Sequence, residues 1–298
     1  MRSLDSRNPG SVAEPESELG CPAVSLPELV PVSVIVPTLN EADNIEPLLA
    51  RLERVLPAGS EIIFVDDSDD ETPAVIRSIQ QQARHPIRLY HRLPHQRAGG
   101  LGGAVVAGLR VARSPWACVL DADLQHPPEL IPCLLEEAMR TGADIAIASR
   151  YRSSSEDVGG LTRLRAAVSR ALVTATRLLF WRRLREVTDP LSGFFLVRTA
   201  AVNCQSLRPR GFKILLEILV RHPHLRTVEV SFQLDRRHAG RSKASLREGM
   251  RYLVHLTALR LSRPYSGTAA RGWESEASRE LQVPSARRWS GEHEELGD

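Results

Sequence analysis

Two aspartates and a glutamine occupy alternate positions in the run Asp121-Ala-Asp-Leu-Gln125. In an extended segment alternate side chains point to one face, so these three can direct oxygen atoms at one point. Carboxylate and amide oxygens in that number suit Mg²⁺ or Mn²⁺, which completes its shell with water and phosphate oxygens. The spacing therefore predicts a metal site at Asp121, Asp123 and Gln125. The alternative is a solvated turn in which an aspartate caps a helix.

A second acidic cluster, Asp66 to Asp70, follows the apolar run Glu61-Ile-Ile-Phe-Val65. Adjacent carboxylates at the end of a buried strand need hydrogen-bond donors, which a ribose or a base edge can supply. We therefore expect Asp67 to bind a ligand. The alternative is that it caps the helix that opens at Thr72-Pro73.

Short apolar runs alternate with longer helical patterns over the residues that carry these clusters. This alternation predicts an α/β fold, a Rossmann-like, mostly parallel sheet with helices on both faces. We expect Asn40 to cap the first helix and a helix to run from Ala104 to Val111 after a glycine-rich turn. The predicted strands are 32–36, 61–65, 87–90, 116–120 and 144–148.

Ligands of such sheets bind beyond the carboxyl ends of the strands. Polar clusters follow four of the predicted strands, at residues 37–41, 66–70, 121–123 and 149–150, so the sequence predicts one shared crevice. The glycine-rich run 99–103 does not complete a dinucleotide fingerprint, because Val105 stands where a third small residue is needed.

Six motifs stand in a fixed order along the chain: VPTLNE (36–41), VDDSDDET (65–72), LDADLQHPPE (120–129), SRY (149–151), DPLSGFF (189–195) and GRSK (240–243). This order resembles that of family 2 glycosyltransferases, and the chain most resembles the dolichol- or polyprenol-phosphate mannosyltransferase branch. The resemblance covers about residues 32 to 255. It implies a GT-A fold, a nucleotide-sugar donor with GDP-mannose favoured, a divalent metal and a polyprenyl phosphate acceptor.

The resemblance also implies roles for single residues. Asp123, Asp189 and Arg150 would be catalytic, although Asp189 equally suits a cap for the Pro190 turn. The acceptor phosphate would contact Arg150, Arg165 and Ser169. The nucleotide-sugar pocket would comprise Pro37, Leu39, Glu41, Val65, Asp67, Asp121, Ala122, Asp123, Gln125, Arg150, Arg237 and Lys243.

Sugar transfer of this type needs charge stabilisation more than a strong base. Negative charge grows on the departing diphosphate, and a metal with nearby arginines stabilises it. An acceptor phosphate is already ionised near pH 7, so its attack opposite the diphosphate would invert the anomeric centre. The alternatives are a UDP-glucose or UDP-N-acetylhexosamine donor and a non-catalytic nucleotide-sugar-binding scaffold.

Residues 158–185 contain seven arginines and no acidic residue. Within this segment Leu172, Ala175 and Leu179 recur at helical spacing, which is typical of a basic amphipathic helix on anionic lipid. Residues 246–263 repeat the pattern with His255 on the predicted polar stripe. The alternative for each helix is packing on the protein core.

Composition and termini bound the remaining possibilities. The 298 residues include 42% hydrophobic and 25% charged residues, as in globular proteins. A net charge of +3 and 5% aromatic residues argue against nucleic acid as a partner. No apolar run suits a membrane span or a secretory signal, so we expect a cytoplasmic protein bound peripherally to the inner membrane face; a membrane-protein partner stays open. The expected organisation is a disordered tail (1–30), a GT-A domain (31–245), a basic helix (246–263) and a second disordered tail (264–298).

Overall fold

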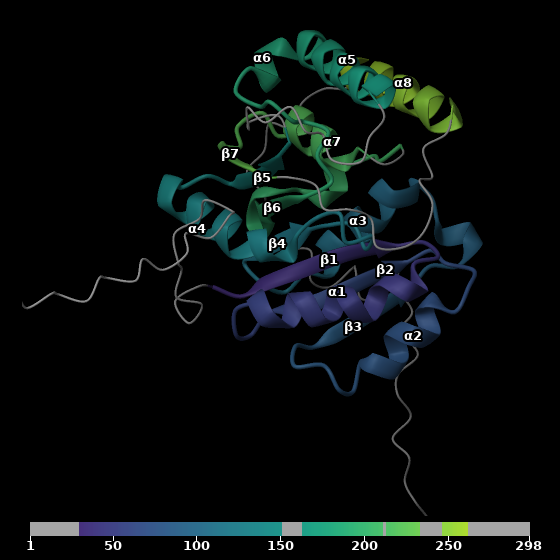
Figure 1. Cartoon of the computed structure of the whole chain (residues 1–298). Coiled ribbons are helices and arrows are strands. Elements are labelled where there is room, and N and C mark those ends of the chain that lie inside the picture. The colour runs from purple at the N-terminus through teal and green to yellow at the C-terminus, as the bar shows by residue number, and fades with distance from the viewer. Residues whose placement is uncertain (1–29, 151–162, 211–212, 233–245, 262–298) are drawn as a thin grey trace, which may run out of the picture.

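The computed structural model describes residues 30–150, 163–210, 213–232 and 246–261. Its centre is a seven-stranded sheet in the order β3-β2-β1-β4-β6-β5-β7 (Figure 1). The predicted terminal tails lie outside the described ranges apart from Val30.

All pairs of neighbouring strands are parallel except those made by β6, which runs antiparallel to β4 and to β5. The prediction of a mostly parallel sheet is therefore confirmed. Strands β6 and β7 were not predicted from the sequence. The bounds are β1 Val32–Thr38, β2 Glu61–Asp66, β3 Ile87–His91, β4 Trp116–Val119, β5 Ile145–Ser149, β6 Phe195–Arg198 and β7 Thr227–Ser231.

Helices cover both faces of the sheet, as predicted, because side chains alternate along each strand. In β1, Val34 and Val36 join the apolar core beneath α1, α2 and α4, whereas Ile35 joins the core beneath α3 and α7. Both cores consist mainly of buried aliphatic and aromatic side chains. The helices are α1 Ala42–Val55, α2 Thr72–Ile79, α3 Gly100–Val111, α4 Ile131–Thr141 and α7 Ile214–Arg221.

Two predicted helix starts are wrong. Helix α1 has Glu41 at its N-cap, while Asn40 adopts a left-handed backbone with φ 52°. Helix α3 begins at Gly100, so most of the predicted glycine turn is helical. The glycines allow close packing instead: a Cβ at Gly108 would lie 2.4 Å from Ile35 Cγ2 on β1.

Helices α5 (Arg163–Leu179), α6 (Trp181–Leu184) and α8 (Leu246–Leu261) lie together at one end of the molecule (Figure 1). Their buried residues are mostly not those of the predicted apolar stripes. Val173 and Thr176 of α5 are buried, as is Phe180 directly after it, whereas Leu172 of the predicted stripe packs only partly on the core and Leu179 is exposed. In α8 His255 is buried, whereas Val254 and Leu261 are exposed. No helix in the described ranges has both the length and the apolarity to cross a bilayer.

Candidate active site

The loops that follow β1 and β2 are tied together by side chain to backbone hydrogen bonds. The Asn40 backbone N–H donates to Ser68 Oγ at 2.8 Å, and the Asp69 N–H donates to Asn40 Oδ1 at 3.0 Å. The Glu41 N–H donates to Thr72 Oγ1 at 3.0 Å. Asn40 thus links two strand ends, which explains its left-handed backbone better than a helix cap does.

Asp67 forms a buried ion pair with Arg92, the residue that follows β3. Arg92 Nε and Nη2 donate to the two carboxylate oxygens at 2.7 and 2.6 Å, and Nη2 also donates to the Gly100 carbonyl at 2.9 Å. The alternative role as a cap for α2 is wrong, because Asp70 accepts from both the N–H and the hydroxyl of Thr72. Asp67 therefore joins the end of β2 to the start of α3.

The run that follows β4 forms a tight loop around the predicted metal ligands. The Gln125 N–H donates to Asp123 Oδ1 at 3.1 Å, and Leu124 adopts a left-handed backbone with φ 63°. The Asp121 N–H donates to His126 Nδ1 at 3.1 Å, which assigns the proton of a neutral ring to Nε2. Strained backbone of this kind in a non-glycine residue is concentrated at functional sites.

His126 is held rigidly beneath the loop. Its ring packs against Phe194 at 5.3 Å and Phe232 at 6.0 Å between centroids. Burial lowers the pKa of His126 from 6.5 to about 4, although the nearby Asp123 carboxylate opposes that shift. His126 is therefore a neutral acceptor for the Asp121 backbone at physiological pH.

Arg150 and Asp189 form a bidentate pair across the ends of β5 and the loop before β6. Arg150 Nε donates to Asp189 Oδ2 at 2.8 Å and Nη2 donates to Oδ1 at 3.1 Å. The Asp189 side chain is fully buried and that of Arg150 is 23% exposed. Glu229 on β7 fixes this loop by accepting from the N–H groups of Thr188 and Asp189 at 2.8 and 3.0 Å. The Asp189 carboxylate is thus engaged with Arg150 rather than capping the Pro190 turn.

Lys213, directly before α7, extends into the same region. Its Nζ donates to the Leu191 carbonyl at 2.8 Å. Burial lowers the pKa of Lys213 to about 8; Arg150 lowers it further, and the carboxylates of Asp189 and Asp121 oppose the shift. Two cationic and two acidic side chains from four parts of the chain therefore act on one another at one edge of the sheet.

A divalent metal fits the donor chemistry of this edge. Asp121 and Asp123 supply carboxylate oxygens and Gln125 an amide oxygen, the ligand types that Mg²⁺ and Mn²⁺ prefer. In the described part of the chain no three His, Cys, Asp or Glu side chains form a ready-made metal cage. This donor set matches a cation that completes its shell with substrate oxygens.

The remaining predicted site residues are placed to different extents. Pro37 and Ala122 are buried and Val65 is fully so, whereas Leu39 is 40% exposed and Glu41 accepts from Asn44 at 2.7 Å. Arg165 and Ser169 belong to helix α5 by their backbone. Arg237 and Lys243 lie outside the described residues.

Four residues of this edge were not singled out from the sequence: Arg92, His126, Glu229 and Lys213. Each acts by contact with a residue distant in the sequence or by backbone hydrogen bonds that no local pattern reveals. Of the four, only Lys213 could have been noticed in the sequence, because lysine is rare in this chain: two of its 39 Lys and Arg residues are lysines.

Comparisons with known proteins identify the family of the chain. Residues 33–209 match the family model described as Glycosyl transferase family 2. Dolichol-phosphate mannosyltransferase of Pyrococcus furiosus is 36% identical over 76% of this chain, and the match spans 63% of that protein's own length. Dolichol-phosphate mannosyltransferase of Saccharomyces cerevisiae is 33% identical over 76% of this chain and 86% of its own.

A solved structure shows the same fold. Glucosyl-3-phosphoglycerate synthase from Mycobacterium tuberculosis, crystallised with Mn²⁺, UDP and glucosyl-3-phosphoglycerate, has a TM-score of 0.57 and 21% identity. The superposition covers 83% of this chain and 87% of that one. The matched family model and the two relatives establish that the chain belongs to glycosyltransferase family 2 and is a dolichol-phosphate mannosyltransferase-like glycosyltransferase.

Proposed function

We propose that this protein transfers mannose from GDP-mannose to a polyprenyl phosphate, with inversion, at the cytoplasmic face of a membrane. The observation that carries the proposal is that the loop before β6 joins the cationic and acidic parts of the site. Asp189 of this loop pairs with Arg150, and its Leu191 carbonyl accepts from Lys213 Nζ. A Cβ at Gly193 of the same loop would lie 3.2 Å from Asp121 Oδ2. Such an arrangement suits a metal-bound diphosphate on one side and an anionic acceptor on the other. The names of the two mannosyltransferase relatives support the donor sugar and the lipid acceptor.

Different residues at the carboxyl edge of the sheet would bind the metal, the nucleoside and the phosphates. Asp121, Asp123 and Gln125 would hold Mg²⁺ or Mn²⁺, whose charge lowers the cost of negative charge on the leaving diphosphate. The cross-linked loops after β1 and β2, with Leu39, Glu41 and Asp67, would bind the nucleoside. Lys213 would place its ammonium group beside the phosphates.

Arg150 would contact the acceptor phosphate, with Arg165 and Ser169 of α5 as further partners. Asp189 holds the Arg150 guanidinium by two hydrogen bonds, so we propose that it works by positioning Arg150. A phosphate monoester has its second pKa near about 6 and needs no strong base to attack. An acceptor oxygen bonds to C1 of the sugar as the bond from C1 to the diphosphate oxygen breaks on the opposite face, which inverts the anomeric centre.

Membrane association is proposed from the outer faces of α5 and α8. Of the predicted stripe on α5, Ala175 is exposed and Leu179 is 42% exposed, whereas Leu172 packs partly against the core. On α8 Val254 is 51% exposed. Ala175, Leu179 and Val254 are therefore available at the surface, as a membrane-bound helix requires.

A donor screen tests the activity. The full chain is incubated with a polyprenyl phosphate and either radiolabelled GDP-mannose, UDP-glucose or UDP-N-acetylglucosamine, with Mg²⁺, Mn²⁺ or a chelator. We expect labelled lipid from GDP-mannose only, in a metal-dependent reaction. Product from a UDP-sugar would move the proposal to the alternative donor, and binding of donor without turnover would identify a non-catalytic scaffold.

A further inference from the structure

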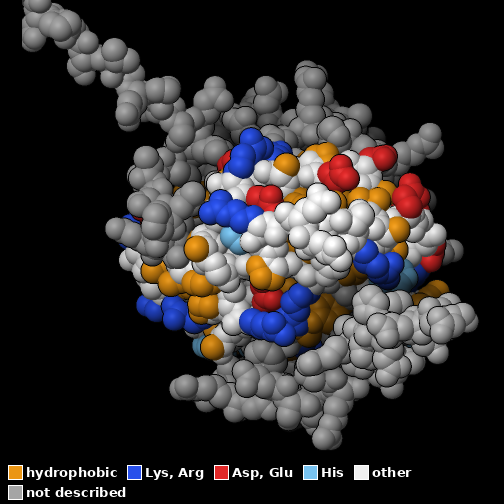
Figure 2. Space-filling model, turned by 90° about the horizontal axis from the view of Figure 1, so that it is seen from below, with side chains coloured by type: hydrophobic (Ala, Val, Ile, Leu, Met, Phe, Trp, Pro, Cys, Tyr) orange, Lys and Arg blue, Asp and Glu red, His pale blue; other side chains and the backbone are white. Residues whose placement is uncertain are grey.

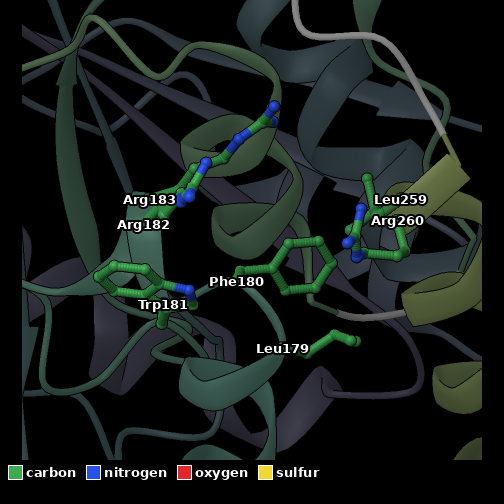
Figure 3. A pocket seen from close by; sticks show the side chains of 7 residues that line it. All are labelled: Leu179, Phe180, Trp181, Arg182, Arg183, Leu259 and Arg260. Carbon is green, nitrogen blue, oxygen red and sulfur yellow. The ribbon is translucent and has the colours of Figure 1, made fainter.

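A pocket of about 520 Å³ opens where the end of α5 and helix α6 meet the last turn of α8 (Figure 3). Arg182, Arg183 and Arg260 line it, and none of its lining residues is acidic. None belongs to the crevice at the strand ends. Its volume falls in the range of small-ligand sites, and arginine forks suit phosphate oxygens.

The arginines are held at the pocket by neighbouring groups. The Arg182 guanidinium lies over the Trp181 ring, with 5.5 Å between its carbon and the ring centroid. Arg183 donates from Nη1 to the Val220 carbonyl on α7. Figure 3 shows the Phe180 ring directed from the α5–α6 junction toward Arg260 on α8. Two of the three cations are thus positioned before any ligand binds.

Large apolar side chains that line the pocket or adjoin its lining residues in the sequence are exposed. Leu178 is 71% exposed, Trp181 60% and Leu261 86%. Exposed tryptophan and leucine beside arginine are typical of surfaces that lie at the boundary of a bilayer. The opposite face of the molecule differs, since acidic and basic side chains intermingle there (Figure 2). The pocket therefore combines a lining whose charged residues are all arginines with exposed apolar side chains beside it in the sequence.

We propose that this pocket binds the phosphate of an anionic membrane lipid while Leu178, Trp181 and Leu261 enter the interface. Charge complementarity selects this occupant. The site is separate from the one proposed for the acceptor phosphate: Arg165 and Leu179 are 14 residues apart on α5, about 21 Å along the helix. One phosphate cannot reach both places. The inference rests on the proposed function only in its use of the membrane.

Vesicle flotation of the full chain tests the pocket. Vesicles contain phosphatidylcholine alone or with phosphatidylglycerol at three to one. We compare the wild type with Arg182→Gln/Arg260→Gln and with the control Arg77→Gln/Arg140→Gln, which removes the same charge from exposed sites on α2 and α4. Each arginine near an anionic surface raises the affinity for the membrane about fivefold. Removal of two arginines should therefore lower the vesicle affinity of the pocket variant roughly thirtyfold, and that of the control variant far less.

Further arms identify the ligand. Trp181→Ala is expected to fold, because the side chain is exposed, and to weaken binding as well. Sodium phosphate is expected to release the protein no better than sodium chloride of equal ionic strength. Four outcomes would each overturn the proposal. The pocket and control variants lose the same amount of vesicle affinity, or the wild type binds neutral vesicles as tightly as anionic ones. Trp181→Ala binds as tightly as the wild type, or phosphate releases the protein better than chloride does.

The proposed function is tested apart from the pocket. Turnover of the wild type is measured on a short-chain isoprenyl phosphate in the absence of vesicles. Arginine-dependent vesicle binding without turnover would reject the proposed function and leave the pocket intact. Turnover without such binding would reject the pocket and leave the proposed function intact.

Discussion

Replacing Asp189 by asparagine should disable Arg150 without removing it. The change leaves the guanidinium facing an uncharged amide in a place where the carboxylate is fully buried. Removing one partner of a buried ion pair costs about 3–5 kcal/mol. Because Arg150 is 23% exposed and partly solvated, we expect the lower end, about 3 kcal/mol in the free energy of unfolding. A guanidinium displaced by about 1 Å should lower kcat about a hundredfold.

A double-mutant cycle of Asp189→Asn and Arg150→Gln separates positioning from independent catalysis. If the two side chains act as one unit, the double variant should resemble the single ones. The coupling in urea unfolding should then equal the loss in one single variant, about 3 kcal/mol, at the upper end of the range for contacting residues. The matched control is Asp69→Asn, which removes the same charge from an exposed pair with Arg97 and should leave stability near that of the wild type. Additive losses in both unfolding and kcat would refute the reasoning.

Three further outcomes follow from the geometry. Asp123→Ala should form no labelled product, while its melting temperature, measured by circular dichroism, stays that of the wild type. Near-normal turnover of this variant in metal-containing buffer would contradict the proposed metal site. The unfolded chain binds the His126 proton near pH 6.5 but the folded chain only near 4, so stability falls as pH drops through this window. Between pH 7 and pH 4 the free energy of unfolding in urea should therefore fall by about 3 kcal/mol more in the wild type than in His126→Asn. Equal decreases in the two proteins would show that the pKa of His126 is not lowered in the fold. Gly108→Ala should lower the melting temperature despite its better helix propensity, because the new Cβ meets Ile35 at 2.4 Å, and a higher melting temperature would disprove the clash.

The alternation of apolar and helical patterns predicted five strands and the four polar strand ends, because backbone periodicity is a local property. The periodicity of apolar residues does not predict which charged residues form ion pairs. Asp67 pairs with Arg92, 25 residues away, and Arg150 with Asp189, 39 residues away. Nothing in the local sequence marks one arginine among many as the partner, since the choice depends on which strand ends become neighbours.

The phase of α5 was missed for a different physical reason. Apolar spacing marked Leu172, Ala175 and Leu179 as one stripe, with lipid as its expected contact and the protein core as the alternative, yet the structure buries Val173, Thr176 and Phe180. Burial of Thr176 is tolerated because its hydroxyl donates to the Leu172 carbonyl at 2.7 Å and contacts the Tyr252 hydroxyl. A satisfied hydroxyl and a large aromatic ring are thus buried in preference to Ala175 and Leu179, which stay at the surface.

The antiparallel strand β6 completes the site, although the alternation pattern does not predict it. Because β6 runs against β4 and β5, the loop before it lies at the edge where those two strands end. That loop carries Asp189 to Arg150, and a Cβ at its Gly193 would lie 3.2 Å from Asp121 Oδ2. A sixth strand parallel to the others would have placed the loop at the opposite edge, away from both acidic residues of the β4 loop. The antiparallel direction of one short strand therefore brings the Arg150–Asp189 ion pair and the predicted metal ligands into the same crevice.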